Sequence, residues 1–127
     1  MYAKSANELV VYKIAFQSAK EIDGRCRKIS FHWTIPEVSQ VIRSSSSVAA
    51  NITEGFGKRF YPKLLIHYLN IALGSSDETQ NHLHLLNAKG YIDEDELSYY
   101  SGSYKNLSVR ILNWINYLKK RHNILLG

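Results

Sequence analysis

The chain has 127 residues, of which 45% are hydrophobic and 21% charged, and its formal net charge is +5. This length suits a single domain, expected over residues 1–127, and the positive charge favours an acidic partner such as nucleic acid. The single cysteine excludes an internal disulfide and a multi-cysteine zinc site, and no apolar run is long enough for a membrane span, so we predict a cytoplasmic protein without membrane association.

The first predicted helix runs from about Ser5 to about Arg25. Ser5 and Glu8 have the spacing of a capping box, in which each side chain accepts a hydrogen bond from the other residue's backbone. Hydrophobic periodicity then predicts the face that packs on the core. That face consists of Leu9, Tyr12, Phe16 and Ala19.

A basic and then aromatic link follows at residues 26–33. Cys26 lies between Arg25 and Arg27, and neighbouring cations of this kind lower the pKa of an exposed thiol. Phe31 and Trp33 are expected to attach the link to the rest of the molecule. A lone cysteine in an exposed link is more often incidental than reactive.

The second predicted helix begins around Thr34, with Pro36 in its first turn, and ends near Gly55. Thr34 has the side chain of an N-cap, and Glu37 follows at the capping-box position. Apolar or small residues then recur with the three-and-four spacing of one helix face. They are Val38, Val41 or Ile42, Ser45, Val48, Ile52 and Gly55, and we interpret this helix as the centre of the fold.

Asn51 and Glu54 flank that small-residue face one turn apart. An unpaired buried polar group costs about 1–3 kcal/mol. The pair is therefore predicted to form hydrogen bonds with a neighbouring helix, which makes Glu54 a buried structural carboxylate.

The third predicted helix runs from Pro62 to about Lys89, and its middle is again small. Glycine inside a helix costs about 1 kcal/mol relative to alanine, so Gly74 is expected to pack against the serine-rich part of the second helix. The predicted buried face consists of Leu65, Tyr68, Ala72, Ser75, Thr79, Leu83 and Leu86.

The fourth predicted helix starts at Asp93, with Glu96 at the capping-box position, and runs to about His122. Its apolar residues step by threes and fours. Four amphipathic helices joined by short links predict an all-α fold, an antiparallel up-down four-helix bundle. The apolar residues of this last helix are Leu97, Tyr104, Leu107, Ile111, Trp114 and Leu118.

Three side chains, Glu54, Glu78 and His82, come nearest to a metal site. Carboxylate-bridged di-iron bundles need four carboxylates and two Glu-x-x-His pairs, whereas here Asn81 stands three residues after Glu78. We therefore predict that these carboxylates are structural and that the protein binds no metal or other cofactor. No nucleophile elbow or phosphate-binding glycine loop is visible either, so a carboxylate-metal enzyme is the weakest alternative.

Clustered basic residues give the better functional lead. The predicted nucleic-acid-binding residues are Arg43 on the second helix and Lys58, Arg59 and Lys63 around the turn that follows it. Phe60, Tyr61 and Phe31 could stack on bases. A second basic group at the end of the fourth helix is assigned instead to complementing the helix dipole. It consists of Lys119, Lys120, Arg121 and His122.

The stretch QVIRSSSSVAANITEGFGKR resembles a segment of the four-helix-bundle proteins encoded in intervening sequences of bacterial large-subunit (23S) rRNA genes. That family has a Gln-x-x-Arg element, a Ser-Ile-x-x-Asn-Ile-Ala-Glu-Gly segment, a basic turn and a later Ile-Ala-x-Gly-Ser-x-x-Glu element. The matching positions are Gln40, Arg43, Ser47, Asn51, Ile52, Glu54 and Gly55, and then Ile71, Ala72, Gly74, Ser75 and Glu78.

The resemblance implies an up-down bundle that assembles into a ring, typically a pentamer, without known enzymatic activity. The chain is also similar to the accessory proteins of diversity-generating retroelements, which are thought to bind nucleic acid and a reverse transcriptase. The leading hypothesis is a non-enzymatic homo-oligomer with a basic face for RNA or DNA. The alternative is a protein–protein interaction scaffold, and the two differ because only phosphate contacts weaken steeply with salt.

Overall fold

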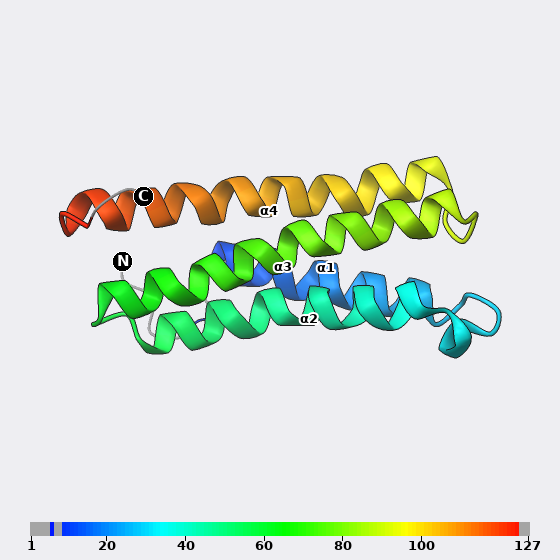
Figure 1. Ribbon diagram of the computed structural model, residues 1–127, viewed down its shortest axis with the longest axis horizontal. Helices are drawn as coiled ribbons and strands as arrows, with labels where there is room; N and C mark the ends of the chain where they lie inside the picture. The colour runs from blue at the N-terminus through cyan, green and yellow to red at the C-terminus, as the bar shows by residue number, and fades with distance from the viewer. Residues whose placement is uncertain (1–5, 7–8, 125–127) are drawn as a thin grey trace.

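The computed structural model describes residue 6 and residues 9–124. Four long helices account for most of these residues, and one short 3-10 helix precedes the second of them (Figure 1). Their bounds are α1 Val10–Cys26, η2 His32–Thr34, α2 Pro36–Gly57, α3 Pro62–Ala88 and α4 Glu94–Arg121.

The helices form an antiparallel up-down four-helix bundle, which confirms the predicted fold class (Figure 1). Each helix packs against its neighbours in the chain, and α1 also packs against α4, so the four helices close around one core. The short links between consecutive helices enforce this order, because a short link leaves the next helix only an antiparallel place beside the previous one.

The small-residue face of α2 lies at the centre of the core, as its spacing predicted. Val41, Val48 and Ile52 are completely buried. Gly55 lies so close to α3 that an added Cβ would come within 3.0 Å of the Cβ of Tyr68. The absence of a side chain at Gly55 therefore sets how closely α2 and α3 approach each other.

Hydroxyl groups join the helices inside this core. Thr79 of α3 donates a hydrogen bond to the Oγ of Ser44 on α2 at 2.8 Å. The hydroxyls of Ser47 and Ser75 lie 2.9 Å apart across the same pair of helices. Ser76 donates to the carbonyl oxygen of Tyr104 on α4 at 3.1 Å. These bonds satisfy hydroxyls that would be costly if they were buried without a partner.

The helix ends agree with the sequence in part. Asp93 and Glu96 form the predicted capping box at the start of α4. The N-cap of α2 is Ile35 and not Thr34, because the Thr34 hydroxyl donates to the carbonyl oxygen of Phe31 within the preceding turn. The described part of α1 begins at Val10, and the capping box predicted at residues 5–8 lies outside the described residues.

The predicted core face of α1 was wrong in part, because Leu9 and Tyr12 pack against the core but Phe16 does not. Phe16 is more than half exposed, and the buried positions are Ala15, Ser18, Ile22 and Cys26. Cys26 is therefore not an exposed reactive thiol. Burial raises the pKa of Cys26 to about 11, and the nearby Arg25 guanidinium offsets only part of that effect. Three of the four buried residues, Ala15, Ser18 and Cys26, are small, so α1 can lie close to the helices it packs against.

Candidate nucleic-acid interface

The antiparallel order brings two basic segments to one end of the bundle. The α2–α3 turn and the C-terminus of α4 lie at the same end (Figure 1), and a shared groove lined by Lys63 and His122 connects them. We call this end the basic pole and define it by six cations, which are Lys58, Arg59, Lys63, Lys119, Lys120 and Arg121.

The local sequence explains why the α2–α3 turn is well ordered. After α2 ends, the N–H of Lys58 donates to the carbonyl oxygen of Gly55 at 2.9 Å, and the N–H of Tyr61 donates to that of Lys58 at 2.8 Å. Pro62 then occupies the first turn of α3, where its missing N–H costs nothing. These bonds fix the backbone that carries Lys58 and Lys63.

Arg59 is held by its aromatic neighbours. Its Nη1 donates to the carbonyl oxygen of Phe56 at 3.0 Å. Its guanidinium carbon lies 4.3 Å from the centre of the Phe56 ring and 4.9 Å from the centre of the Phe60 ring. Cation–π contacts of this kind leave the charge on the surface while they restrict the side chain.

The charges of the chain are distributed unevenly along the bundle. Arg25 pairs with Glu96 and Lys89 pairs with Glu37 at the end opposite the basic pole. Within the described residues, none of the ion pairs includes a cation of the basic pole. No Asp or Glu follows Glu96 anywhere in the sequence. The exposed carboxylate of Glu54 lies one helical turn before Lys58, so the six cations outnumber it and the basic pole keeps an excess of positive charge.

The structure separates the four residues predicted to bind nucleic acid. Lys58, Arg59 and Lys63 share the basic pole, but Arg43 lies about 22 Å away along the axis of α2. Phe31, proposed as a stacking residue, lies at the opposite end of the bundle and is exposed, as is Trp33. Neither ring attaches its link to the core, contrary to the prediction.

The C-terminal cations are the part of this surface that sequence reasoning missed. Lys119, Lys120 and Arg121 were assigned to the dipole of α4, and they do lie in its last turn. The up-down order of the four predicted helices could have identified them. In an up-down bundle, the end of the fourth helix must lie beside the turn between the second and third helices.

The residues that resemble the family motif, in the stretches 40–55 and 71–78, are divided between the core and the surface. Gly55 lies at the contact between α2 and α3, and Ser47 and Ser75 bridge these helices. Asn51 donates to Ser47 of its own helix, to the carbonyl oxygen at 2.8 Å and to the hydroxyl at 3.0 Å, and not to a neighbouring helix as predicted. Gln40 is exposed.

Three further predictions on this motif were wrong. Glu54 and Glu78 are exposed and not buried, because their positions point away from the four-helix core. Gly74 is also exposed, and an added Cβ there would meet nothing within 4 Å. Glu78 contacts His82 at 3.2 Å. In the described part of the chain, no three potential ligands among His, Cys, Asp and Glu gather as a metal site would require.

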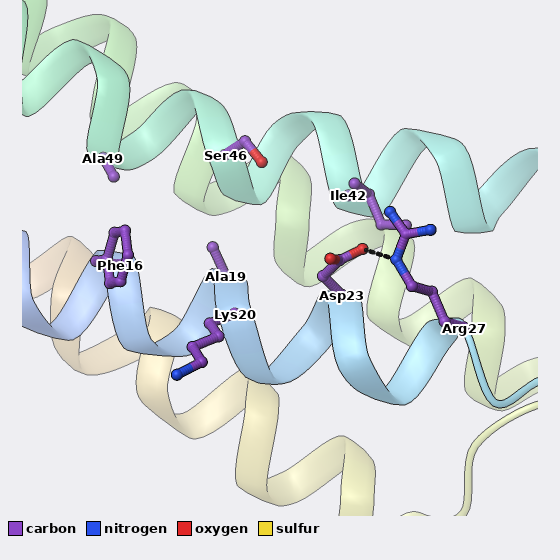
Figure 2. Close-up of a pocket in the computed structure, with 8 residues that line it drawn as sticks. All are labelled: Phe16, Ala19, Lys20, Asp23, Arg27, Ile42, Ser46 and Ala49. Carbon is purple, nitrogen blue, oxygen red and sulfur yellow. Dashed lines mark hydrogen bonds and ion pairs between the residues drawn. The ribbon is translucent and has the colours of Figure 1, made fainter.

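A groove lies between α1 and α2, along the side of the bundle (Figure 2). Its volume is about 570 Å³. The exposed ring of Phe16 and the small residues Ala19 and Ala49 line it. Asp23 and Arg27 are joined at its edge by a hydrogen bond of 2.9 Å. Its lining is largely apolar, and it lies away from the basic pole.

Comparison with known proteins assigns the chain to a family. The sequence model described as "23S rRNA-intervening sequence protein" matches residues 7–113. The chain belongs to the 23S rRNA-intervening sequence protein family. The match includes the α2–α3 turn but ends before the cations of the α4 C-terminus. The sequence resemblance to this family is thus confirmed, and the match indicates no enzyme family.

A solved structure supports the fold of this family member. It is a protein of unknown function from the S23 ribosomal protein family of Bacteroides thetaiotaomicron. The two chains superpose with a TM-score of 0.78 at 24% sequence identity, over 84% of this chain and 96% of the other. A search of curated proteins found no match. Among the described residues, no helix combines the length and the apolar character needed to cross a membrane.

Proposed function

We propose that this family member is a non-enzymatic, homo-oligomeric bundle that binds RNA or DNA in the cytoplasm through its basic pole. The observation that carries the proposal is the gathering of six cations from two separate segments at one end, none of them in an ion pair among the described residues. Such a surface attracts the negatively charged phosphate backbone of RNA and DNA. The name of the family refers to rRNA, a polymer of this class.

Assembly would strengthen this binding. Large apolar side chains remain exposed along the outer faces of α3 and α4, among them Ile71, Tyr99, Val109 and Tyr117. Exposed apolar area of this kind is typical of an interface. In a ring of five chains, which the family resemblance implies, five basic poles would act together, and several weak phosphate contacts would combine. Light scattering at micromolar concentration should show an oligomer, and a monomer would contradict this part of the proposal.

The nucleic-acid proposal is tested by changing cations that hold no structural contact. We expect Lys58→Gln, Lys63→Gln and Lys120→Gln together to weaken binding of labelled RNA and DNA. Titrations at about 50 mM and about 200 mM salt give the slope of the logarithm of the binding constant against the logarithm of the salt concentration. The magnitude of this slope should fall by about one unit for each phosphate contact removed. Arg59 is left intact because it contacts Phe56. Arg43→Gln is measured separately because of its distance from the basic pole.

The matched control is Lys28→Gln, an exposed cation at the opposite end of the bundle. It should leave both the affinity and the salt slope unchanged. If the triple variant binds as the unmodified protein does, the basic pole is not the site. If the unmodified protein binds neither polymer at low salt, the nucleic-acid proposal is wrong.

The second candidate function is a protein–protein interaction scaffold, and the groove between α1 and α2 favours it. Phe16 exposes an aromatic ring there beside small residues that would admit a partner's side chains. Binding through such a surface would depend weakly on salt, in contrast to phosphate binding. Phe16→Ser should abolish binding of a protein partner in this groove, whereas the triple variant of the basic pole should leave that binding unchanged.

A further inference from the structure

We propose that the basic pole binds unpaired nucleotides, with Phe60 and Tyr61 as the surfaces on which bases stack. This inference rests on the proposed nucleic-acid function and specifies the strand state of its ligand.

Phe60 and Tyr61 are consecutive aromatic residues whose side chains are largely exposed. Phe60 is 80% exposed and Tyr61 is 66% exposed. An aromatic side chain loses the stabilisation of burial when it stays in water, so two consecutive exposed rings among cations form an apolar surface that a ligand can cover. The backbone bonds of the turn hold both residues at the tip of the basic pole.

The Phe60 ring is oriented by the protein. The Arg59 guanidinium lies over it at 4.9 Å and lies over the buried ring of Phe56 at 4.3 Å. Arg59 therefore links the exposed ring to the core. A platform that is already oriented loses less conformational entropy when a base stacks on it.

Tyr61 lies beside a groove that the C-terminus of α4 completes. Asn123 adopts a left-handed backbone conformation with φ of 54°, which asparagine tolerates, and the N–H of Ile124 then donates to the carbonyl oxygen of Lys119 at 2.8 Å. This turn directs the chain toward α3. The resulting groove has a volume of about 430 Å³ and is lined by Tyr61, Pro62, Lys63, Leu64, His122 and Ile124.

Cations surround these apolar surfaces on both sides. Lys58 and Lys63 come from the turn, and Lys119 and Lys120 come from α4. The N-terminus of α3 also lies here without a side-chain cap, so its dipole adds positive potential. Aromatic rings between cations are the arrangement that tracks a single-stranded backbone and stacks its bases.

Single strands fit this surface better than duplexes do. In a duplex the base faces are already stacked on one another, so exposed aromatic rings cannot reach them, and only the cations would contribute. An anionic membrane surface would also attract cations beside aromatic rings, so the experiment includes it as a competing ligand.

The test compares strand states and separates stacking from charge. Labelled oligo-uridine and oligo-thymidine single strands and a hairpin duplex of similar charge are titrated by fluorescence anisotropy at two salt concentrations. We expect tighter binding of the single strands. The double variant Phe60→Leu, Tyr61→Leu should weaken single-strand binding roughly 5- to 100-fold, leave duplex binding unchanged and keep the salt slope.

The matched control is Phe31→Leu, Trp33→Leu at the opposite end, where the rings are 68% and 72% exposed. It should change neither affinity, and circular dichroism should show all variants folded. Equal binding of duplex and single strand, or no effect of the Phe60 and Tyr61 changes, would overturn this inference and leave the proposed function standing. Absence of binding to any oligonucleotide would overturn both. Binding to anionic phosphatidylglycerol vesicles without binding to single strands would also overturn it, in favour of a membrane ligand.

Discussion

Replacing Gly55 by alanine tests how the central contact of the bundle is built. The new Cβ would lie 3.0 Å from the Cβ of Tyr68 and 3.2 Å from Cδ1 of Leu65. The first of these atoms is attached directly to the α3 backbone and cannot rotate away, so α2 and α3 must separate by a few tenths of an ångström. Overpacking of this kind costs about 1–3 kcal/mol.

A gain in helix propensity opposes that cost. Alanine is favoured over glycine inside a helix by roughly 1 kcal/mol, and less near a helix end such as that of α2. We therefore expect Gly55→Ala to lower the free energy of unfolding by about 1–2 kcal/mol. For a domain of this size, that corresponds to a melting temperature lower by about 3–8 °C.

Gly102→Ala is the matched control, because Gly102 lies inside α4 and an added Cβ would meet nothing within 4 Å. It should raise the free energy of unfolding by about 0.5–1 kcal/mol. Urea unfolding followed by circular dichroism measures both variants. A Gly55→Ala protein as stable as the Gly102→Ala protein would refute the close approach of α2 and α3.

Three further results are expected. Thr79→Val should cost about 1–2 kcal/mol in urea unfolding, because it removes a buried hydroxyl that bonds the Ser44 hydroxyl and the Ser75 carbonyl oxygen, each at 2.8 Å, whereas Thr53→Val on the exposed face should be nearly neutral. Hydrogen bonding to Arg25 lowers the pKa of Glu96, so this pair stabilises the fold above the carboxyl's unfolded pKa and loses its effect as pH falls through the lowered value. Glu96→Gln should therefore destabilise the protein at neutral pH and much less in acid, and an equal loss at both would contradict the ion pair. Because burial raises the pKa of Cys26, its thiol should react with a disulfide reagent slowly in the folded protein and rapidly in denaturant, and rapid labelling of the folded chain would show that the thiol is accessible.

The sequence by itself determined the helices, their antiparallel order and the central face of α2. Hydrophobic periodicity reports which side of a helix is apolar, and short links leave few arrangements. The capping residues Asp93 and Glu96 were predictable because their hydrogen bonds are local. The Lys58, Arg59 and Lys63 cluster was predictable for the same reason, since neighbours in sequence remain neighbours around a turn.

Only the tertiary structure decided which polar and small residues face the core. Gly55 and Gly74 look alike in sequence, yet one forms the tightest helix contact and the other lies in open solvent. Glu54 borders a small-residue face but points outward. The buried face covers only part of the circumference of a helix. A small rotation of the helix about its axis therefore moves residues at the border of that face into the core or out to solvent, and packing against the two neighbouring helices sets this rotation.

The basic pole was also a tertiary result. Lys58 and Lys119 lie far apart in the chain. They reach the same end of the bundle because α3 runs to the opposite end and α4 runs back. Arg43 and Lys58 belong to one stretch of sequence, yet the rise of α2 separates them by about 22 Å. Charge patterns along a chain therefore identify candidate cations, but the helix length and the order of the helices decide which of them act on one ligand.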